Sequence, residues 1–262
     1  MTLDTTKKAS HGFTLIELSI VLVIIGLIVG GVLVGQDLIK AAELRAAVGQ
    51  IEKYDAATNT FRTKYNGLPG DIASPANFGL TAEGIGGASD TGDNDAAIEA
   101  SADDADQFDS EAAAFFRHMF QANLIQENIT VTDFDTADID SATGLLPASK
   151  LGRGVQVAVR SHSGTNYYFL IAQSGITNGA FTLTNGSALP VIDAYNIDSK
   201  MDDGNPSLGK VQAISDFVTV DAGAAGATAD ECVDTTGDNL YQISSTTYQA
   251  DTECMLRIRG SF

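Results

Sequence analysis

One acidic residue stands inside the most apolar stretch of the chain. Glu17 is the only charged side chain among residues 13–35, which are otherwise rich in Ile, Leu, Val and Gly. A carboxylate inside a membrane segment costs roughly 3 kcal/mol on insertion scales, and such groups usually serve a function. The position of Glu17 therefore indicates that this segment does more than anchor the chain in a membrane.

The apolar stretch is long enough to cross a bilayer. Its 23 residues would form a helix of roughly 34 Å, and the core of a bilayer is about 30 Å thick. Lys7 and Lys8 precede it and predict a cytoplasmic N-terminus by the positive-inside rule. A secretory signal peptide is disfavoured because the small residue Gly12 lies before the apolar run rather than after it. A plain signal anchor is the other alternative, but it leaves Glu17 unexplained.

The residues from Gly12 to Leu18, Gly-Phe-Thr-Leu-Ile-Glu-Leu, resemble the prepilin peptidase site of type IV pilins and of the pseudopilins of type II secretion. The resemblance implies cleavage after Gly12 and N-methylation of the new amino terminus at Phe13. It also implies that Glu17, the fifth residue of the mature chain, neutralises the N-terminal amine of a neighbouring subunit. Since two unpaired charges in hydrocarbon are both costly, such pairing would favour one register between subunits.

The resemblance further implies partners and a location. The partners are copies of the chain or other pilins and pseudopilins, the prepilin peptidase, and an inner-membrane assembly platform. The subunit would be stored in the inner membrane and would then join a periplasmic or extracellular filament. Many type IV pilins carry a proline in the mature helix, whereas this chain has none among residues 13–68. Gly26, Gly30 and Gly31 stand there instead, and they either loosen the helix or allow close helix contacts.

The sequence predicts four parts. These are a leader at 1–12, a transmembrane or filament-core helix at 13–35, an amphipathic continuation of that helix at 36–66, and a head at 67–262. The continuation carries one buried face at helical spacing, formed by Leu44, Val48, Ile51, Thr58, Phe61 and Tyr65. The Gly-Leu-Pro-Gly segment at 67–70 is then expected to end the helix.

The head is predicted to combine a further helix with several strands. Residues 110–126 show an amphipathic helical pattern after a serine cap. Alternation or compact apolar runs predict strands at residues 155–159, 167–172, 183, 217–220 and 255–258, with a hairpin turn at 163–166. A helix followed by strands indicates an α+β fold with an antiparallel sheet packed on the long helix, which is also the pilin fold that the resemblance implies.

A long acidic stretch opens the head. Residues 71–117 contain eleven acidic side chains before Arg117 and no other basic one. Two groups within it suggest a calcium loop, because hard cations take several oxygen ligands. They are Asp90, Asp93, Asn94 and Asp95, and then Asp103, Asp104 and Asp106. The spacing does not match an EF-hand, and a solvated, flexible acidic loop is the favoured interpretation.

A second acidic group follows later in the head, and its four members are Asp198, Asp202, Asp203 and Asn205. Their oxygens are suited to a calcium ion, and Gly204 permits a tight bend between them. An Asx-rich turn, in which the aspartates bond their own backbone, explains the same residues. The sequence leaves both interpretations open.

The chain has two cysteines, Cys232 and Cys254. A head beyond the inner membrane meets an oxidising compartment, so a disulfide between them is expected. Pilins that resemble this chain often enclose a C-terminal region with such a pair. A zinc site would need two further ligands, and neither His118 nor His162 lies near in sequence.

The sequence does not predict an enzyme. It lacks a glycine-rich phosphate loop, a His-Glu-x-x-His motif and a nucleophile elbow. The formal net charge of −19 argues against direct nucleic-acid binding by the head. Two alternatives to an ordinary filament subunit remain. One is a minor or tip subunit that acts as an adhesin or ligand-binding module, and the other is a membrane-anchored periplasmic enzyme.

Overall fold

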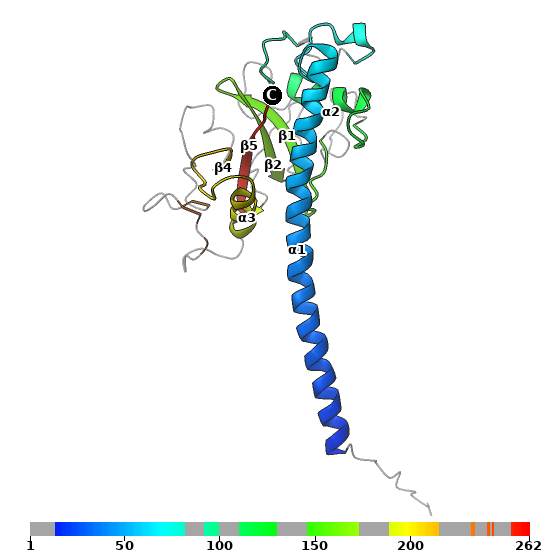
Figure 1. Ribbon diagram of the computed structural model, residues 1–262, viewed down its shortest axis with the longest axis vertical. Helices are drawn as coiled ribbons and strands as arrows, with labels where there is room; N and C mark the ends of the chain where they lie inside the picture. The colour runs from blue at the N-terminus through cyan, green and yellow to red at the C-terminus, as the bar shows by residue number, and fades with distance from the viewer. Residues whose placement is uncertain are drawn as a thin grey trace, which may run out of the picture. The chain divides into compact units, whose positions relative to one another are not determined.

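A computed structural model describes residues 14–81, 92–99, 110–129, 146–172, 189–214, 232–233, 240–241, 243 and 253–262. The chain divides into two compact units, Met1–Ala42 and Glu43–Phe262. The boundary lies within one helix, α1 (Leu15–Tyr65), so the first unit contains the apolar part of α1 and the second contains its remainder together with the head (Figure 1).

The second part of α1 packs into the head as its sequence pattern predicts. Leu44, Ile51 and Phe61 are buried, and their helical spacing places them on one face of the helix. The helix ends at Tyr65 because Asn66 takes the left-handed conformation, with φ of 58°. The backbone N–H of Asn66 donates to the carbonyl oxygen of Arg62 at 2.9 Å, which is the single bond of an αL cap.

An antiparallel sheet forms the centre of the head. Its strands are β1 (Val155–His162), β2 (Thr165–Ala172), β3 (Leu189–Pro190), β4 (Val211–Ile214) and β5 (Glu253–Arg259). The order is β1-β2-β5-β3, and β4 also pairs with β5. The predicted hairpin at 163–166 is confirmed, but its turn is only Ser163 and Gly164, whose φ values are 50° and 73°. Two positive φ values are typical of a type I′ turn, which matches the twist of the paired strands.

The helix α2 (Ser110–Gln121) is shorter than the predicted 110–126. Asn123 has a φ of 57° and stops the helix. Its N–H donates to the carbonyl oxygen of Phe120 at 2.9 Å, and the N–H of Leu124 donates to that of Met119 at 3.0 Å. This pair of bonds is a Schellman motif with asparagine in place of the usual glycine. The predicted end at residue 126 was wrong because apolar residues continue at helical spacing beyond this motif.

A third helix, α3 (Val191–Met201), is absent from the sequence prediction. It includes Asp198, which we expected in a turn, and a short 3-10 helix at Pro75–Phe78 was likewise not predicted. The predicted strands at 155–159, 167–172 and 255–258 are confirmed. Those at 183 and 217–220 lie outside the described residues.

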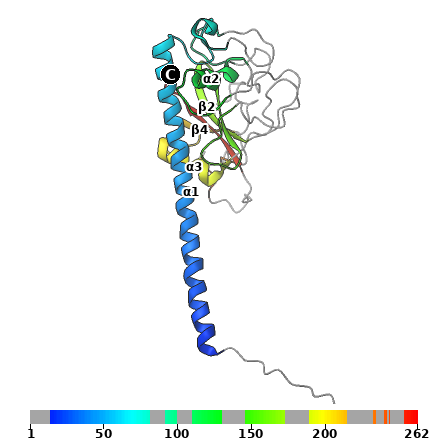
Figure 2. The same ribbon diagram turned by 90° about the vertical axis from the view of Figure 1, so that its right-hand side faces the viewer.

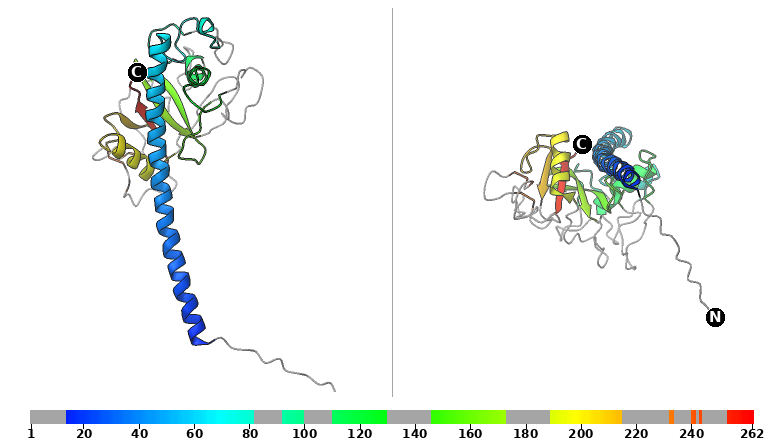
Figure 3. Two further views of the ribbon diagram at one scale, coloured as in Figure 1. Left: turned by 45° about the vertical axis from the view of Figure 1, so that its right-hand side comes forward. Right: turned by 90° about the horizontal axis from the view of Figure 1, so that it is seen from below.

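Aromatic side chains join the helices to one face of the sheet. Tyr168 on β2 lies 6.4 Å, centroid to centroid, from both Tyr54 on α1 and Phe115 on α2. The two helices therefore cover the same face, as Figures 2 and 3 show. Phe262 closes this core at 5.7 Å from Phe115 and 5.6 Å from Tyr168. The result is the predicted α+β arrangement, with an antiparallel sheet packed on the long helix.

Candidate assembly site

The first part of α1 exposes an apolar surface around its whole circumference. Large side chains from Leu15 to Ile39 are exposed by half or more of their surface, and none of residues 14–34 is buried. Apolar surface of this extent is unfavourable in water and requires lipid or partner helices. Among the described residues, α1 is the one helix that is long and apolar enough to cross a membrane.

Glu17 lies at the start of this helix and forms a capping box with Thr14. The Glu17 carboxylate accepts hydrogen bonds from the Thr14 backbone N–H at 2.8 Å and from the Thr14 hydroxyl at 2.7 Å. In return, the Glu17 backbone N–H donates to the Thr14 hydroxyl oxygen at 3.3 Å. Two backbone donors that lack helical partners are thereby satisfied, and the carboxylate is held at the first turn.

The capping box was missed in the sequence, although its signal is present. Thr14-Leu-Ile-Glu17 fits the pattern of Ser or Thr followed three residues later by Glu, directly before an apolar run. Gly12 and Phe13, the predicted cleavage and methylation positions, lie outside the described residues. Glu17 therefore lies in the first turn of α1, shortly after the predicted mature N-terminus at Phe13.

The two cysteines are joined, as the sequence predicts. Cys232 and Cys254 form a disulfide with a Cα–Cα distance of 5.5 Å. Cys254 belongs to β5, and both residues are buried. The bond therefore ties residues 232–233 to the central sheet.

The predicted calcium residues gather at the C-terminal end of α3. Carboxylate oxygens of Asp198, Asp202 and Asp203 lie within 4.8 Å of one another. Asp198 is buried, and it accepts hydrogen bonds from the Tyr241 hydroxyl at 2.9 Å and from the Gly204 N–H at 3.2 Å. Burial raises the pKa of Asp198 to about 6.

The same residues also bond their own backbone. Asp203 accepts from the N–H of Asn205 at 2.9 Å, and Asn205 accepts from the N–H of Ser207 at 3.1 Å. Asp202 accepts from the backbone N–H of Lys210. These bonds are those of an Asx-rich turn, and they leave further oxygen lone pairs on each carboxylate. Calcium binding at this turn stays a prediction.

The acidic stretch at 71–117 is not simply a solvated loop. Asp71 and Glu111 are buried, and oxygens of Asp71, Asp93 and Glu111 lie within 4.8 Å of one another. Asp71 accepts from the N–H of Asn94 at 2.6 Å, and Glu111 accepts from that of Glu99 at 2.9 Å. Burial raises the pKa of Asp71 to about 6 and that of Glu111 to about 7. The favoured interpretation is therefore wrong for these two residues, which fold the segment 92–99 onto the N-terminus of α2.

His118 on α2 has a structural role next to this cluster. Its Nδ1 accepts a hydrogen bond from the Gly70 N–H at 3.0 Å, and its Nε2 lies 2.9 Å from the carbonyl oxygen of Thr81. An acceptor at Nδ1 and a donor at Nε2 define one neutral tautomer. Desolvation by burial lowers the pKa of His118 to about 4. The imidazole thus fastens residues 70 and 81 to α2.

One comparison with known proteins found a match, and it lies at the N-terminus of the chain. Residues 7–33 match the family described as the prokaryotic N-terminal methylation motif. No curated protein and no solved structure matched the chain. The matched segment contains Gly12, Phe13 and Glu17 and continues into the apolar part of α1. The matched motif is the hallmark of type IV pilins and pseudopilins, and in this chain it leads directly into the long helix that packs on an antiparallel sheet.

Proposed function

We propose that the chain is a structural subunit of a type IV pilus or a type II secretion pseudopilus. The observation that carries this proposal is the N-terminal methylation motif at residues 7–33, continuous with a helix that is apolar around its circumference. Such a helix can lie in a bilayer and can also pack in a bundle of like helices. The same segment therefore serves for storage in the membrane and for packing in a filament.

The proposed mechanism is mechanical. Prepilin peptidase removes residues 1–12 from the subunit in the inner membrane, and the new N-terminus at Phe13 is methylated. Glu17 then pairs with the amine of Phe13 in an adjacent subunit, and an assembly platform driven by a cytoplasmic ATPase moves the helix into the growing bundle. The filament is periplasmic or extracellular. In this scheme the chain is the substrate of the peptidase and performs no catalysis.

The capping box supports the docking step. It holds the Glu17 carboxylate at the first turn of α1 through donors of Thr14, so the charge is accommodated before any partner arrives. Two accepted hydrogen bonds lower the cost of placing a carboxylate in lipid. A carboxylate at this position is also only four residues from Phe13, whose counterpart in a neighbouring subunit is the proposed partner.

The substitution Glu17→Ala tests the docking step. We expect normal removal of the leader and a strong loss of filament incorporation, measured by immunoblotting of the sheared filaments and of the membranes. Ser19→Ala is the matched control, because Ser19 is a nearby polar residue whose hydroxyl donates to the Ile16 carbonyl oxygen of its own helix. Normal incorporation of the Glu17→Ala chain would refute the docking role.

Intact-mass measurement tests the processing step. The expected mature chain begins at N-methyl-Phe13, and retention of residues 1–12 would contradict the proposal as a whole. Immunogold labelling with antibody against the head then distinguishes the subunit types. Label along sheared filaments indicates a major pilin, whereas label at filament ends, or no surface filament, indicates a minor pilin or a pseudopilin.

A further inference from the structure

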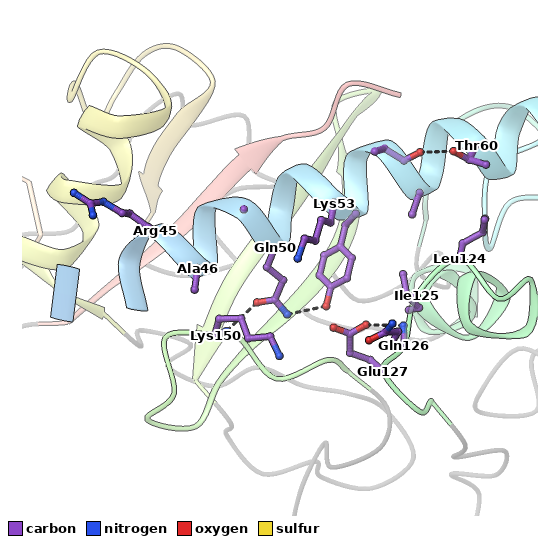
Figure 4. A pocket seen from close by; sticks show the side chains of 14 residues that line it. Arg45, Ala46, Gln50, Lys53, Thr60, Leu124, Ile125, Gln126, Glu127 and Lys150 are labelled. Carbon is purple, nitrogen blue, oxygen red and sulfur yellow. Dashed lines mark hydrogen bonds between the residues drawn. The ribbon is translucent and has the colours of Figure 1, made fainter. Parts of the chain in front are cut away.

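A groove runs along the second part of α1 within the head. It has a volume of about 890 Å³ and lies between α1 and two loop segments, residues 124–127 and residue 150. Leu124 and Ile125 contribute apolar side chains to it. Figure 4 shows Gln50 and Lys53 on α1 facing Glu127 and Lys150 across the groove.

The charge of this groove is opposite to that of the chain. Its lining includes Arg45, Lys53 and Lys150, all of them exposed, and a single acidic residue, Glu127. The whole chain has 34 acidic side chains against 15 basic ones. Within the described residues, none of these three cations forms an ion pair with a carboxylate. The groove therefore presents positive charge on a strongly acidic protein.

The groove is held in shape by Gln50. The side-chain amide of Gln50 donates to the carbonyl oxygen of Ala148 at 2.9 Å and to the Tyr54 hydroxyl at 2.8 Å. Its carbonyl oxygen accepts from the backbone N–H of Lys150 at 2.8 Å. Because Gln50 is buried and fully bonded, it fixes the backbone of Lys150 against α1. The cations on the two sides of the groove are thus attached to one rigid frame.

We propose that the groove receives the acidic segment 92–99 of a second copy of this chain. The segment presents three exposed carboxylates, those of Asp93, Asp95 and Glu99. Residues 82–109 as a whole contain nine acidic side chains and no basic one. Opposite charges of this kind fix the register of partners and disfavour like-charged alternatives. The inference rests on the proposed function, because a filament is what brings a second copy to α1.

Thiol cross-linking provides a direct test. Both native cysteines are held in the disulfide, so an introduced cysteine is the one free thiol of each subunit. Cells would make two full-length subunits together, Lys53→Cys with an epitope tag and Asp95→Cys without it, and sheared filaments or membranes would be treated with a short bis-maleimide. We expect at least ten times more tagged heterodimer than with the control Arg62→Cys, which lies on the same helix outside the groove. Equal yields would overturn the proposal.

Charge reversal provides a second, independent measurement. The double variant Lys53→Glu/Lys150→Glu is expected to reduce incorporation into filaments at least ten-fold, with Arg62→Glu unchanged. Reversal of the partner segment by Asp95→Lys/Glu99→Lys should restore at least half of the wild-type incorporation when the two variants are made together.

The outcomes separate the groove from the proposed function. A wild-type chain that fails to assemble refutes the proposed function, whereas normal assembly of the groove variant refutes only the groove. Loss of assembly without the Lys53–Asp95 cross-link would mean that another acidic partner occupies the groove, and it would overturn our assignment of the second copy.

Discussion

Mild acid is expected to weaken the head through His118. The imidazole is buried, accepts a hydrogen bond from the Gly70 N–H at Nδ1, and has both ring nitrogens engaged. Protonation of Nδ1 would replace this acceptor with a second donor and would place a charge in the core. The neutral ring is therefore the form that the folded chain accommodates.

The magnitude follows from the two pKa values. Burial lowers the pKa of His118 from 6.5 to about 4 in the folded chain. This difference corresponds to about 3 kcal/mol at 1.36 kcal/mol per pH unit. Because the folded pKa is depressed, the contribution is complete above pH 6.5, falls as the pH drops below that value, and is lost by about pH 4.

Three carboxyls of the described residues oppose this effect. Burial raises the pKa of Asp71 and of Asp198 to about 6 and that of Glu111 to about 7, so each of them favours the folded state more as the pH falls. The wild-type curve alone therefore mixes opposite terms. The variant His118→Asn separates them, since its side-chain oxygen can still accept from Gly70 but does not titrate.

The assay is urea unfolding of the full-length chain in detergent micelles, followed by tyrosine near-ultraviolet circular dichroism at several pH values. We expect the stability of the wild type relative to His118→Asn to fall by about 3 kcal/mol between pH 7 and pH 4. A difference that stays constant over this range would show that His118 does not titrate as a buried neutral ring, and it would refute the reasoning.

Three further predictions concern the head. Replacing Cys232 and Cys254 with serine should cost about 3 kcal/mol of stability, because the disulfide closes a loop with a sequence separation of 22; an unchanged urea midpoint would contradict this. Phe61→Ala should cost about 3–5 kcal/mol because Phe61 is fully buried, whereas Phe78→Ala, at a half-exposed position, should change the thermal midpoint much less. Millimolar calcium should raise the thermal midpoint, and Asp203→Asn should remove the increase; no effect of calcium on the wild type would reject the site.

The parts of the fold that depend on local pattern were predictable from the sequence. The alternation around Val157 and the apolar run at 167–172 correctly indicate β1 and β2, because strand periodicity is a local property. The end of α1 near residue 66 was predictable from the Gly and Pro residues at 67–70. By contrast, α3 carries Asp193 and Asp198 on buried positions, so its pattern does not resemble an amphipathic helix.

The candidate sites show the same division. Glu17 stands out in the sequence because a charge in an apolar run is locally conspicuous. The cluster of Asp71, Asp93 and Glu111 was not predictable, because residues distant in sequence meet only after α2 docks. Burial of Asp71 and Glu111 depends on that tertiary contact, whereas composition alone favours exposure of acidic residues.

A carboxylate that is already accommodated in its own chain affects the removal of a subunit as much as its addition. If Glu17 docks on a neighbour as proposed, it leaves the two donors of Thr14 and regains them on release. Growth and disassembly then exchange one set of polar contacts for another, and neither leaves a bare charge in lipid.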